Sequence, residues 1–146
     1  MSNWTDKIVC VSGGFDPITI GHIRYIKAAA EIGRVTVILN SDEFLIKKKG
    51  YAFMPEQERK EILDNIKGVH SVMMCIDDDM TVCKTLEVLL PDIFAKGGDR
   101  ILSNTPERKF CAHNGIKVVY GVGGTDKPQS SSWLIDRAIK QKEMIK

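Results

Sequence analysis

Short apolar segments alternate with longer segments that carry apolar residues at helical spacing along almost the whole chain. The short segments are rich in branched residues, as strands covered on both faces of a sheet should be. Strands are predicted at Ile8–Val11, Val35–Leu39, Ser71–Ile76, Ile93–Ala95 and Lys117–Tyr120. Helices are predicted at Gly21–Ile32, Pro55–Ile66, Thr81–Leu90, Pro106–Asn114 and Ser131–Lys142. Strict alternation of this kind predicts an α/β fold with a doubly wound parallel sheet of about five strands and helices on both faces.

Glycine and proline residues agree with these boundaries. Gly33, Gly68 and Gly115 stand where helices should end, and Pro91 ends the helix that contains Leu86–Leu90. The chain has 146 residues, which is the size of one domain, and no linker or internal repeat divides it. We therefore assign residues 1–146 to a single Rossmann-like domain.

Composition and charge exclude several classes of function. The formal net charge is +2, too small to indicate a nucleic acid or an anionic membrane as partner. No apolar stretch approaches the roughly 18 residues that span a bilayer, and the polar start is not a signal peptide. The four cysteines are far apart and form no Cys-Xaa-Xaa-Cys pair, so neither a metal site nor a redox motif is expected. We expect reduced thiols and a cytoplasmic protein.

In a doubly wound sheet, ligands bind beyond the carboxyl ends of the strands. The polar and glycine-rich loops of this chain follow the predicted strands at that edge: Gly13–His22, Asn40–Gly50, Lys96–Arg100 and Gly121–Ser132. In the first of them a glycine turn leads into a helix, where backbone N–H groups and the helix dipole favour an anion. A phosphate site is predicted there.

The same loop carries a family signature. Gly14, Phe15 and Asp16, followed by Thr19-Ile20-Gly21-His22, resemble the first motif of the cytidylyltransferase-like nucleotidyltransferases, in which His-Xaa-Gly-His is usual and threonine replaces the first histidine here. The resemblance implies that His22 contacts the nucleotide phosphates and stabilises the transition state. It also implies that the other motif residues bind nucleotide or phosphate: Gly14, Phe15, Asp16, Thr19 and Gly21. Asp16 is expected to serve the acceptor as well.

Three later segments extend the resemblance. Lys96-Gly97-Gly98-Asp99 is similar to a loop of the heptose and glycerol nucleotidyltransferases, and Ser130-Ser131-Ser132 resembles a triphosphate-binding Ser/Thr motif before a helix. The resemblance implies nucleotide binding by Lys96, Gly97, Asp99, Ser130, Ser131 and Ser132. Asn40-Ser41-Asp42 and Lys47-Lys48-Lys49 are read as a flexible basic loop over the phosphate site, with Lys49 catalytic. Asn40, Arg59 and Arg100 are expected to bind the acceptor.

The implied reaction is transfer of a nucleoside monophosphate from CTP or ATP to a small phosphorylated acceptor, with release of pyrophosphate. The motifs resemble those of the nucleotidyl domain of ADP-heptose synthase and of glycerol-3-phosphate cytidylyltransferase, so a sugar or polyol phosphate is the expected acceptor. Mg²⁺ is the expected cofactor, bound through phosphates and water rather than by a cage of carboxylates. Similar enzymes are commonly homodimers.

Other functions stay open at this point. Thr19 and the serine run also fit a phosphopantetheine adenylyltransferase, although Lys96-Gly97-Gly98-Asp99 does not. A nucleotide-binding module without catalysis shares the fold but does not require His22, Lys49 and the serines together. A dinucleotide-dependent dehydrogenase is disfavoured, because the first turn lacks the Gly-Xaa-Gly-Xaa-Xaa-Gly pattern.

Overall fold

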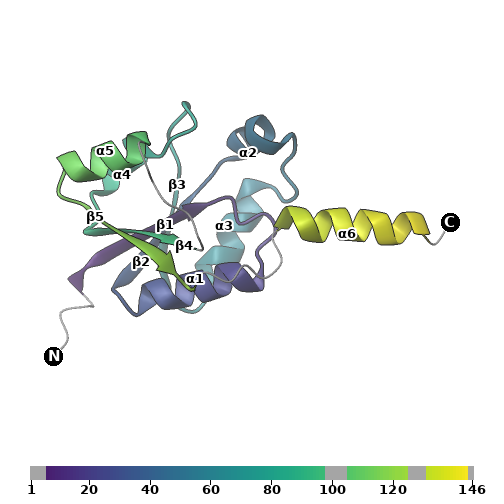
Figure 1. Cartoon of the computed structure of the whole chain (residues 1–146), viewed down its shortest axis with the longest axis horizontal. Coiled ribbons are helices and arrows are strands. Elements are labelled where there is room, and N and C mark those ends of the chain that lie inside the picture. The colour runs from purple at the N-terminus through teal and green to yellow at the C-terminus, as the bar shows by residue number, and fades with distance from the viewer. Residues whose placement is uncertain (1–5, 98–104, 125–130, 145–146) are drawn as a thin grey trace.

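The computed structural model describes residues 6–97, 105–124 and 131–144, and it places five strands in one parallel sheet (Figure 1). The strands are β1 (Ile8–Gly13), β2 (Arg34–Leu39), β3 (Val69–Met74), β4 (Ile93–Gly97) and β5 (Lys117–Val122). Their order across the sheet is β3-β2-β1-β4-β5, and every pair of neighbours is parallel. The predicted doubly wound, Rossmann-like α/β sheet is confirmed.

Six helices connect or follow the strands in the described residues. They are α1 (Ile20–Ala30), α2 (Asp42–Lys49), α3 (Glu56–Asp64), α4 (Cys83–Leu89), α5 (Pro106–His113) and α6 (Ser131–Met144). Five of them match predicted helices within a few residues at each end.

The helix α2 corrects the sequence reading, which took this segment to be a flexible basic loop. Ser41 caps its start, where its hydroxyl accepts a hydrogen bond from the Phe44 N–H at 3.1 Å. Gly50 ends the helix in the left-handed conformation, with φ of 88°. The last turn carries three lysines, whose positive charges interact favourably with the negative end of the helix dipole. The lysines are therefore held on a helix rather than on a loop.

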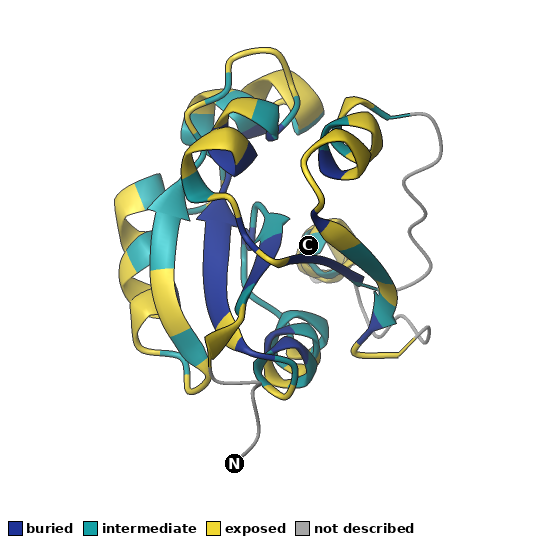
Figure 2. Ribbon diagram, turned by 90° about the vertical axis from the view of Figure 1, so that its left-hand side faces the viewer, coloured by how far each residue is buried: buried dark blue, intermediate teal, exposed yellow. Residues whose placement is uncertain are grey.

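Alternate residues of the central strands face two separate cores. Val9 and Val11 of β1 pack with α1 and α3 on one face, whereas Cys10 between them packs with α4 and α5 on the other. The same alternation continues in β4, where Phe94 faces α4 and α5 and its neighbour Ala95 faces α1. Figure 2 shows that the central strands are the most buried part of the fold. Burial on both faces explains why these strands read as short, continuous apolar runs.

The chain reverses its direction of travel across the sheet at β1. Strands β2 and β3 are added on one side of β1, and β4 and β5 on the other, so the switch point lies between β1 and β4. The two strands pair only at Val9 with Ile93 and at Cys10 with Phe94, whereas β1 stays paired with β2 as far as Gly13. Ligand-binding loops are expected above this point.

The helix α6 extends away from the sheet (Figure 1), and none of its described residues is buried. Its first residue, Ser131, donates a hydrogen bond from its hydroxyl to the Pro17 carbonyl at 2.7 Å. None of the helices in the described part of the chain is both long and apolar enough for a membrane span.

Two adjacent glycines after β5 give a matched test of packing against α1. Gly123 and Gly124 both have positive φ, at 88° and 93°. A Cβ on Gly123 would lie 2.9 Å from the Tyr25 Cα, whereas one on Gly124 would meet nothing within 4 Å. We expect Gly124→Ala to cost about 1–2 kcal/mol through its backbone conformation alone. Gly123→Ala should cost about 1–3 kcal/mol more, because a backbone contact must move.

Urea unfolding of the two variants measures this difference. Equal losses of unfolding free energy in Gly123→Ala and Gly124→Ala would contradict the close packing of this turn on α1.

Candidate functional site

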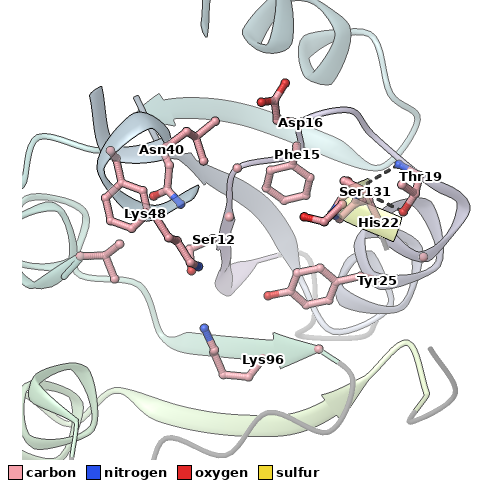
Figure 3. Close-up of a pocket in the computed structure, with 18 of the residues that line it drawn as sticks. Ser12, Phe15, Asp16, Thr19, His22, Tyr25, Asn40, Lys48, Lys96 and Ser131 are labelled. Carbon is pink, nitrogen blue, oxygen red and sulfur yellow. Dashed lines mark hydrogen bonds between the residues drawn. The ribbon is translucent and has the colours of Figure 1, made fainter. Parts of the chain in front are cut away.

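A cavity of about 640 Å³ opens above the switch point, in the range usual for small-molecule sites. It lies among the ends of β1, β2, β4 and β5 and the first residues of α1 and α6 (Figure 3). The predicted site residues that line it are Gly14, Phe15, Asp16, Thr19, Gly21, His22, Asn40, Lys49, Lys96, Gly97, Ser131 and Ser132. Loops far apart in the sequence are thus brought together as expected.

The turn after β1 is shaped by close contacts. A Cβ on Gly14 would lie 2.7 Å from Leu45 of α2, so glycine allows the turn and α2 to approach each other. Phe15 adopts positive φ, at 49°, and is buried. Its ring lies against the His22 ring, with 4.8 Å between the centroids. The two rings are tilted by 52° to each other, so Phe15 packs against the histidine and restricts its ring.

His22 is oriented by the start of its own helix. The Thr19 backbone N–H donates a hydrogen bond to His22 Nδ1 at 2.9 Å (Figure 3). Thr19 is the N-cap and His22 the third helical residue, so the imidazole takes the place of the glutamate in a capping box. A nitrogen that accepts this bond carries no proton, and the neutral ring therefore carries its proton on Nε2. His22 itself lines the cavity.

Two helices direct their N-termini to this end of the cavity. Gly21 and His22 belong to the first turn of α1, and Ser131 and Ser132 begin α6. The bond from Ser131 to the Pro17 carbonyl holds α6 against the turn that precedes α1. Backbone N–H groups at both starts favour an anion.

Lys49 of α2 reaches the turn between β1 and α1. Its ammonium donates to the Asp16 carbonyl at 3.1 Å, pairs with the Asp16 carboxylate at 3.4 Å and lies 4.7 Å from the centroid of the Tyr51 ring. Its neighbour Lys48 also lines the cavity, whereas Lys47 pairs with Glu43 and does not. Two of the three lysines therefore reach the cavity.

Asp16 itself is buried and serves as an anchor. Its carboxylate accepts hydrogen bonds from the backbone N–H groups of Phe53 and Met54, at 2.6 and 2.7 Å. These bonds hold the segment between α2 and α3 against the turn between β1 and α1. Because Lys49 takes part as well, both carboxylate oxygens already have partners inside the protein.

The β4 side of the cavity contributes a buried cation. Lys96 is 7% exposed, and its ammonium lies 4.9 Å from the centroid of the Phe94 ring. Gly97, the next residue, packs against Tyr25, since a Cβ there would lie 3.0 Å from the Tyr25 ring. The Tyr25 hydroxyl donates to the Ala95 carbonyl and so ties α1 to β4.

Arg59 is not placed in the cavity, contrary to the expectation that it binds the acceptor. Its guanidinium is 1% exposed and donates to three backbone carbonyls, those of Gly14, Asn40 and Met54, at 2.7–2.9 Å. It also pairs with the Asp42 carboxylate at 2.7 Å. Arg59 therefore joins the first turn, the end of β2 and the start of α2. It positions the site without lining it.

Three predicted residues, Asp99, Arg100 and Ser130, lie outside the described residues. The structure adds lining residues that sequence reasoning did not select: Ser12, Arg24, Tyr25, Phe44, Leu45, Met80, Thr81 and Val82. Glu107 and, at the end of β5 and just after it, Val122, Gly123 and Gly124 line the cavity as well. Ser12 and Asn40 both occupy the ends of strands, which is a signal that could have selected Ser12 as well. The segment before α4 has no such signal.

The wall formed by residues 80–82 is held by Asp77. Partial burial acts to raise the pKa of this carboxyl, but hydrogen bonds from Thr85, Lys84 and Thr81 hold the pKa below its usual value. Asp77 thus stays ionised at the start of α4, where a negative charge is favoured.

The cysteines take no part in the site. All four are free thiols. Burial raises the pKa of Cys10, and it raises the pKa of Cys111 to about 11. These thiols are therefore protonated at neutral pH, and they pack as small apolar residues behind β1 and β4.

Comparison with known proteins identifies the family. A model of the cytidylyltransferase-like family matches residues 10–132, which include β1 from Cys10 onward, the whole turn between β1 and α1, and the first two residues of α6. FAD synthase of Ferroglobus placidus is 30% identical over 112 residues, which are 77% of this chain and 72% of that protein. The bifunctional protein HldE of Citrifermentans bemidjiense is 28% identical over 143 residues, 91% of this chain and 27% of its own.

The chain thus spans about a quarter of the length of that HldE protein. A crystal structure of a lipopolysaccharide core biosynthesis protein from Thermoplasma volcanium shares the fold, with a TM-score of 0.68 at 22% identity over 84% of this chain and 98% of that one. The family match covers the turn, the histidine and the helix starts that form the cavity. The chain belongs to the cytidylyltransferase-like family of nucleotidyltransferases.

Proposed function

We propose that this protein transfers an adenylyl group from ATP to a small phosphorylated acceptor, with release of pyrophosphate. The observation that carries the proposal is the position of His22, which lines the cavity in the first turn of α1, where the N-termini of α1 and α6 meet it. ATP is placed ahead of CTP because FAD, the product named for one relative, contains an adenylyl group. A sugar or polyol phosphate is the proposed acceptor.

The proposed reaction begins with attack by an acceptor phosphate oxygen on the α-phosphorus of ATP. The new O–P bond forms as the bond from the α-phosphorus to the bridging oxygen of the β-phosphate breaks, and pyrophosphate leaves with that electron pair. The acceptor phosphate is already ionised at neutral pH, so no general base is required. Catalysis then consists of positioning and of stabilising charge on the phosphate oxygens.

The residues divide this work between them. His22 Nε2 donates to a phosphate oxygen on the α1 side, together with the N-termini of α1 and α6. Lys49 supplies positive charge from α2, and Lys96 from β4. Asp16, whose oxygens have internal partners, holds Lys49 and the following loop in place.

Mg²⁺ is proposed as the cofactor and would reach the site bound to the triphosphate. No group of three or more His, Cys, Asp or Glu side chains among the described residues is placed to hold a metal ion. Mg²⁺ favours phosphate oxygens and water as ligands, and the triphosphate would supply the phosphate oxygens. When bound, the ion would neutralise charge on the phosphates.

A substrate matrix tests the proposed function. ATP, CTP, UTP and GTP are each combined with Mg²⁺ and with glycerol 3-phosphate, a sugar 1-phosphate, FMN or phosphopantetheine, and pyrophosphate release is measured. Release with ATP and a sugar or polyol phosphate is the expected result. Release only with phosphopantetheine would support the adenylyltransferase alternative, and nucleotide binding without release from any pair would support a non-catalytic module.

Replacing Lys49 tests the contribution of α2. We expect Lys49→Met to lower kcat/KM by about ten- to a hundredfold, because a charge close to the phosphates is lost. Lys47→Met is the matched control, since Lys47 lies on the same helix but does not line the cavity. Steady-state pyrophosphate release measures both, and equal activities would remove Lys49 from the mechanism.

The homodimer remains a prediction from the family resemblance, and the cytoplasmic location remains a prediction from the pattern of cysteines. Size-exclusion chromatography with light scattering tests the first of them.

A further inference from the structure

The helix α6 packs on the rest of the described fold only at its start. It has 14 residues, which make a helix of about 21 Å, and it extends away from the sheet (Figure 1). Every residue from Asp136 to Met144 is exposed. Helices of this length are marginal in water, and most of their stability in proteins comes from the packing of an apolar face. The exposed part of α6 therefore requires a partner from outside the described fold.

Apolar residues form one stripe along α6. Their spacing places them on a single face of the helix, and we call them the α6 stripe: Leu134, Ile135, Ala138 and Ile139. The first two are half-buried, whereas Ala138 is exposed and Ile139 is 51% exposed. Trp133 lies away from the stripe, with the Arg137 guanidinium 5.4 Å from the centroid of its ring. One face of α6 is thus left for a partner.

The α6 stripe matches a second copy of itself in antiparallel orientation. It consists of two pairs of residues four positions apart, whose midpoints fall at positions 136 and 137. A two-fold axis at this level places Leu134 opposite Ala138 of the partner subunit, and Ile135 opposite Ile139 of the partner subunit. Interfaces of two-fold dimers are self-complementary in this way. Antiparallel helices also bring the positive end of each dipole beside the negative end of the other.

Charge complementarity favours a second copy over an unrelated protein. Ser131 and Lys142 lie on the same face as the α6 stripe, at equal distances on either side of the level of the axis. The axis therefore brings Lys142 of the partner subunit to Ser131, where α6 begins at the cavity. This is the end of the cavity at which we propose that the triphosphate binds. A lysine there adds positive charge beside a group with several negative charges.

The surface around the start of α6 is suited to receive the end of a second helix. Ser131 bonds to the Pro17 carbonyl, and the Phe53 N–H bonds to the adjacent Asp16 carboxylate, so Phe53 lies near the start of α6. Phe53 is 56% exposed, and Ile20, the first residue of α1, is 53% exposed. Large apolar side chains that are exposed around one turn are typical of an interaction surface.

We propose that two copies of this chain form a two-fold dimer through antiparallel packing of their α6 stripes, and that Lys142 of the partner subunit adds a positive charge to the triphosphate end of each cavity. The packing of the stripes is independent of the proposed function, whereas the role of Lys142 rests on it. Bound triphosphate neutralises a lysine that would otherwise lie beside two positive helix ends, so ATP should strengthen the dimer.

Sedimentation velocity of the full chain, with and without ATP and Mg²⁺, tests the dimer. We expect a dimer whose association ATP strengthens by at least about fivefold. Ile139→Glu places a charge in the α6 stripe and should be a folded monomer at concentrations where the wild-type protein is a dimer. Val88→Glu is the matched control, because Val88 is 64% exposed on α4, on the other side of the molecule from α6 (Figure 1). It should dimerise like the wild type.

A mixture of two variants tests the antiparallel register. Ile135→Lys alone should also be monomeric. Mixed with Ile139→Glu, it should form a heterodimer, because the two-fold axis places these two positions opposite each other and their new charges are opposite. Failure of the mixture to associate, when each variant alone is a folded monomer, overturns the register.

Calorimetry with ATP and Mg²⁺ tests the role of Lys142. We expect Lys142→Gln to lose at least about fivefold in affinity for ATP, and the monomeric Ile139→Glu to lose about as much. Lys140→Gln is the control, since Lys140 lies on the same helix but away from the α6 stripe, and its affinity should stay within about twofold of the wild type.

The remaining outcomes separate this inference from the proposed function. A wild-type chain that stays monomeric with and without ATP overturns the interface, and so does an Ile139→Glu variant that dimerises like the wild type. The expected dimer with unchanged ATP affinity in Lys142→Gln overturns only the role of Lys142. A dimer that binds ATP with the help of Lys142, but releases no pyrophosphate with any acceptor, supports this inference and overturns the proposed function.

Discussion

Replacing His22 with alanine should lower kcat by at least about a hundredfold. The Nε2–H of the neutral ring is the donor that we assign to the phosphate oxygens, and the loss of one transition-state donor typically costs about 2.7–4 kcal/mol. Alanine also removes the acceptor of the Thr19 N–H, so the start of α1 loses part of its cap. Steady-state pyrophosphate release and thermal unfolding should be measured on the same samples.

Two further variants separate the chemical role from the cap. Glutamine at position 22 can close a capping box, so His22→Gln should keep the melting temperature near that of the wild type while kcat stays low. His70→Ala removes an exposed histidine on β3 and should leave both quantities unchanged. Turnover of His22→Ala within a few-fold of the wild type would remove His22 from the mechanism.

Replacing Arg59 with methionine should have the largest effect on stability, at least about 3 kcal/mol. The guanidinium is buried, and its loss leaves the Asp42 carboxylate and three backbone carbonyls without their donors. Each buried carbonyl left without its donor typically costs about 1–3 kcal/mol, and the partly exposed Asp42 carboxylate loses its ion pair as well. For a chain of this size, the melting temperature should fall by about 6–12 °C.

Lys60 provides the control for this experiment. It lies next to Arg59 on α3 and forms an exposed pair with Asp64 at 3.0 Å. Exposed pairs of this kind contribute less than about 1 kcal/mol, so Lys60→Met should unfold within about 3 °C of the wild type. A similar melting temperature for the two variants would show that the Arg59 contacts do not stabilise the fold.

The sheet could be predicted from the sequence because its strands are covered on both faces. Apolar runs such as Val35–Leu39, short and rich in branched residues, are typical of strands buried on both faces, and glycine or proline marks the ends of the helices between them. The helix α2 was missed because Leu45 is its one buried residue, and three lysines follow within four positions. Its two end signals, Ser41 and Gly50, were visible, but a single buried position gives no periodicity to read.

The site was predictable where local sequence determines local geometry. The turn at Gly14 and the helix start at His22 lie in one short segment, so their phosphate-binding character could be read directly. The role of Arg59 could not, because its partners are backbone carbonyls that belong to three other segments. A side chain that binds main-chain atoms leaves no trace in the types of the residues that it contacts.

The strand order has a consequence for synthesis of the chain. The β1–β2–β3 part of the sheet and the Arg59 contacts are complete once residue 74 has been made, because they involve no later residue. Until β4 follows at Ile93, one side of β1 is an open edge with unpaired backbone groups. A growing chain can therefore fold the β1–β2–β3 side of the sheet first, and the residues from Ile93 onward then cover the open edge of β1.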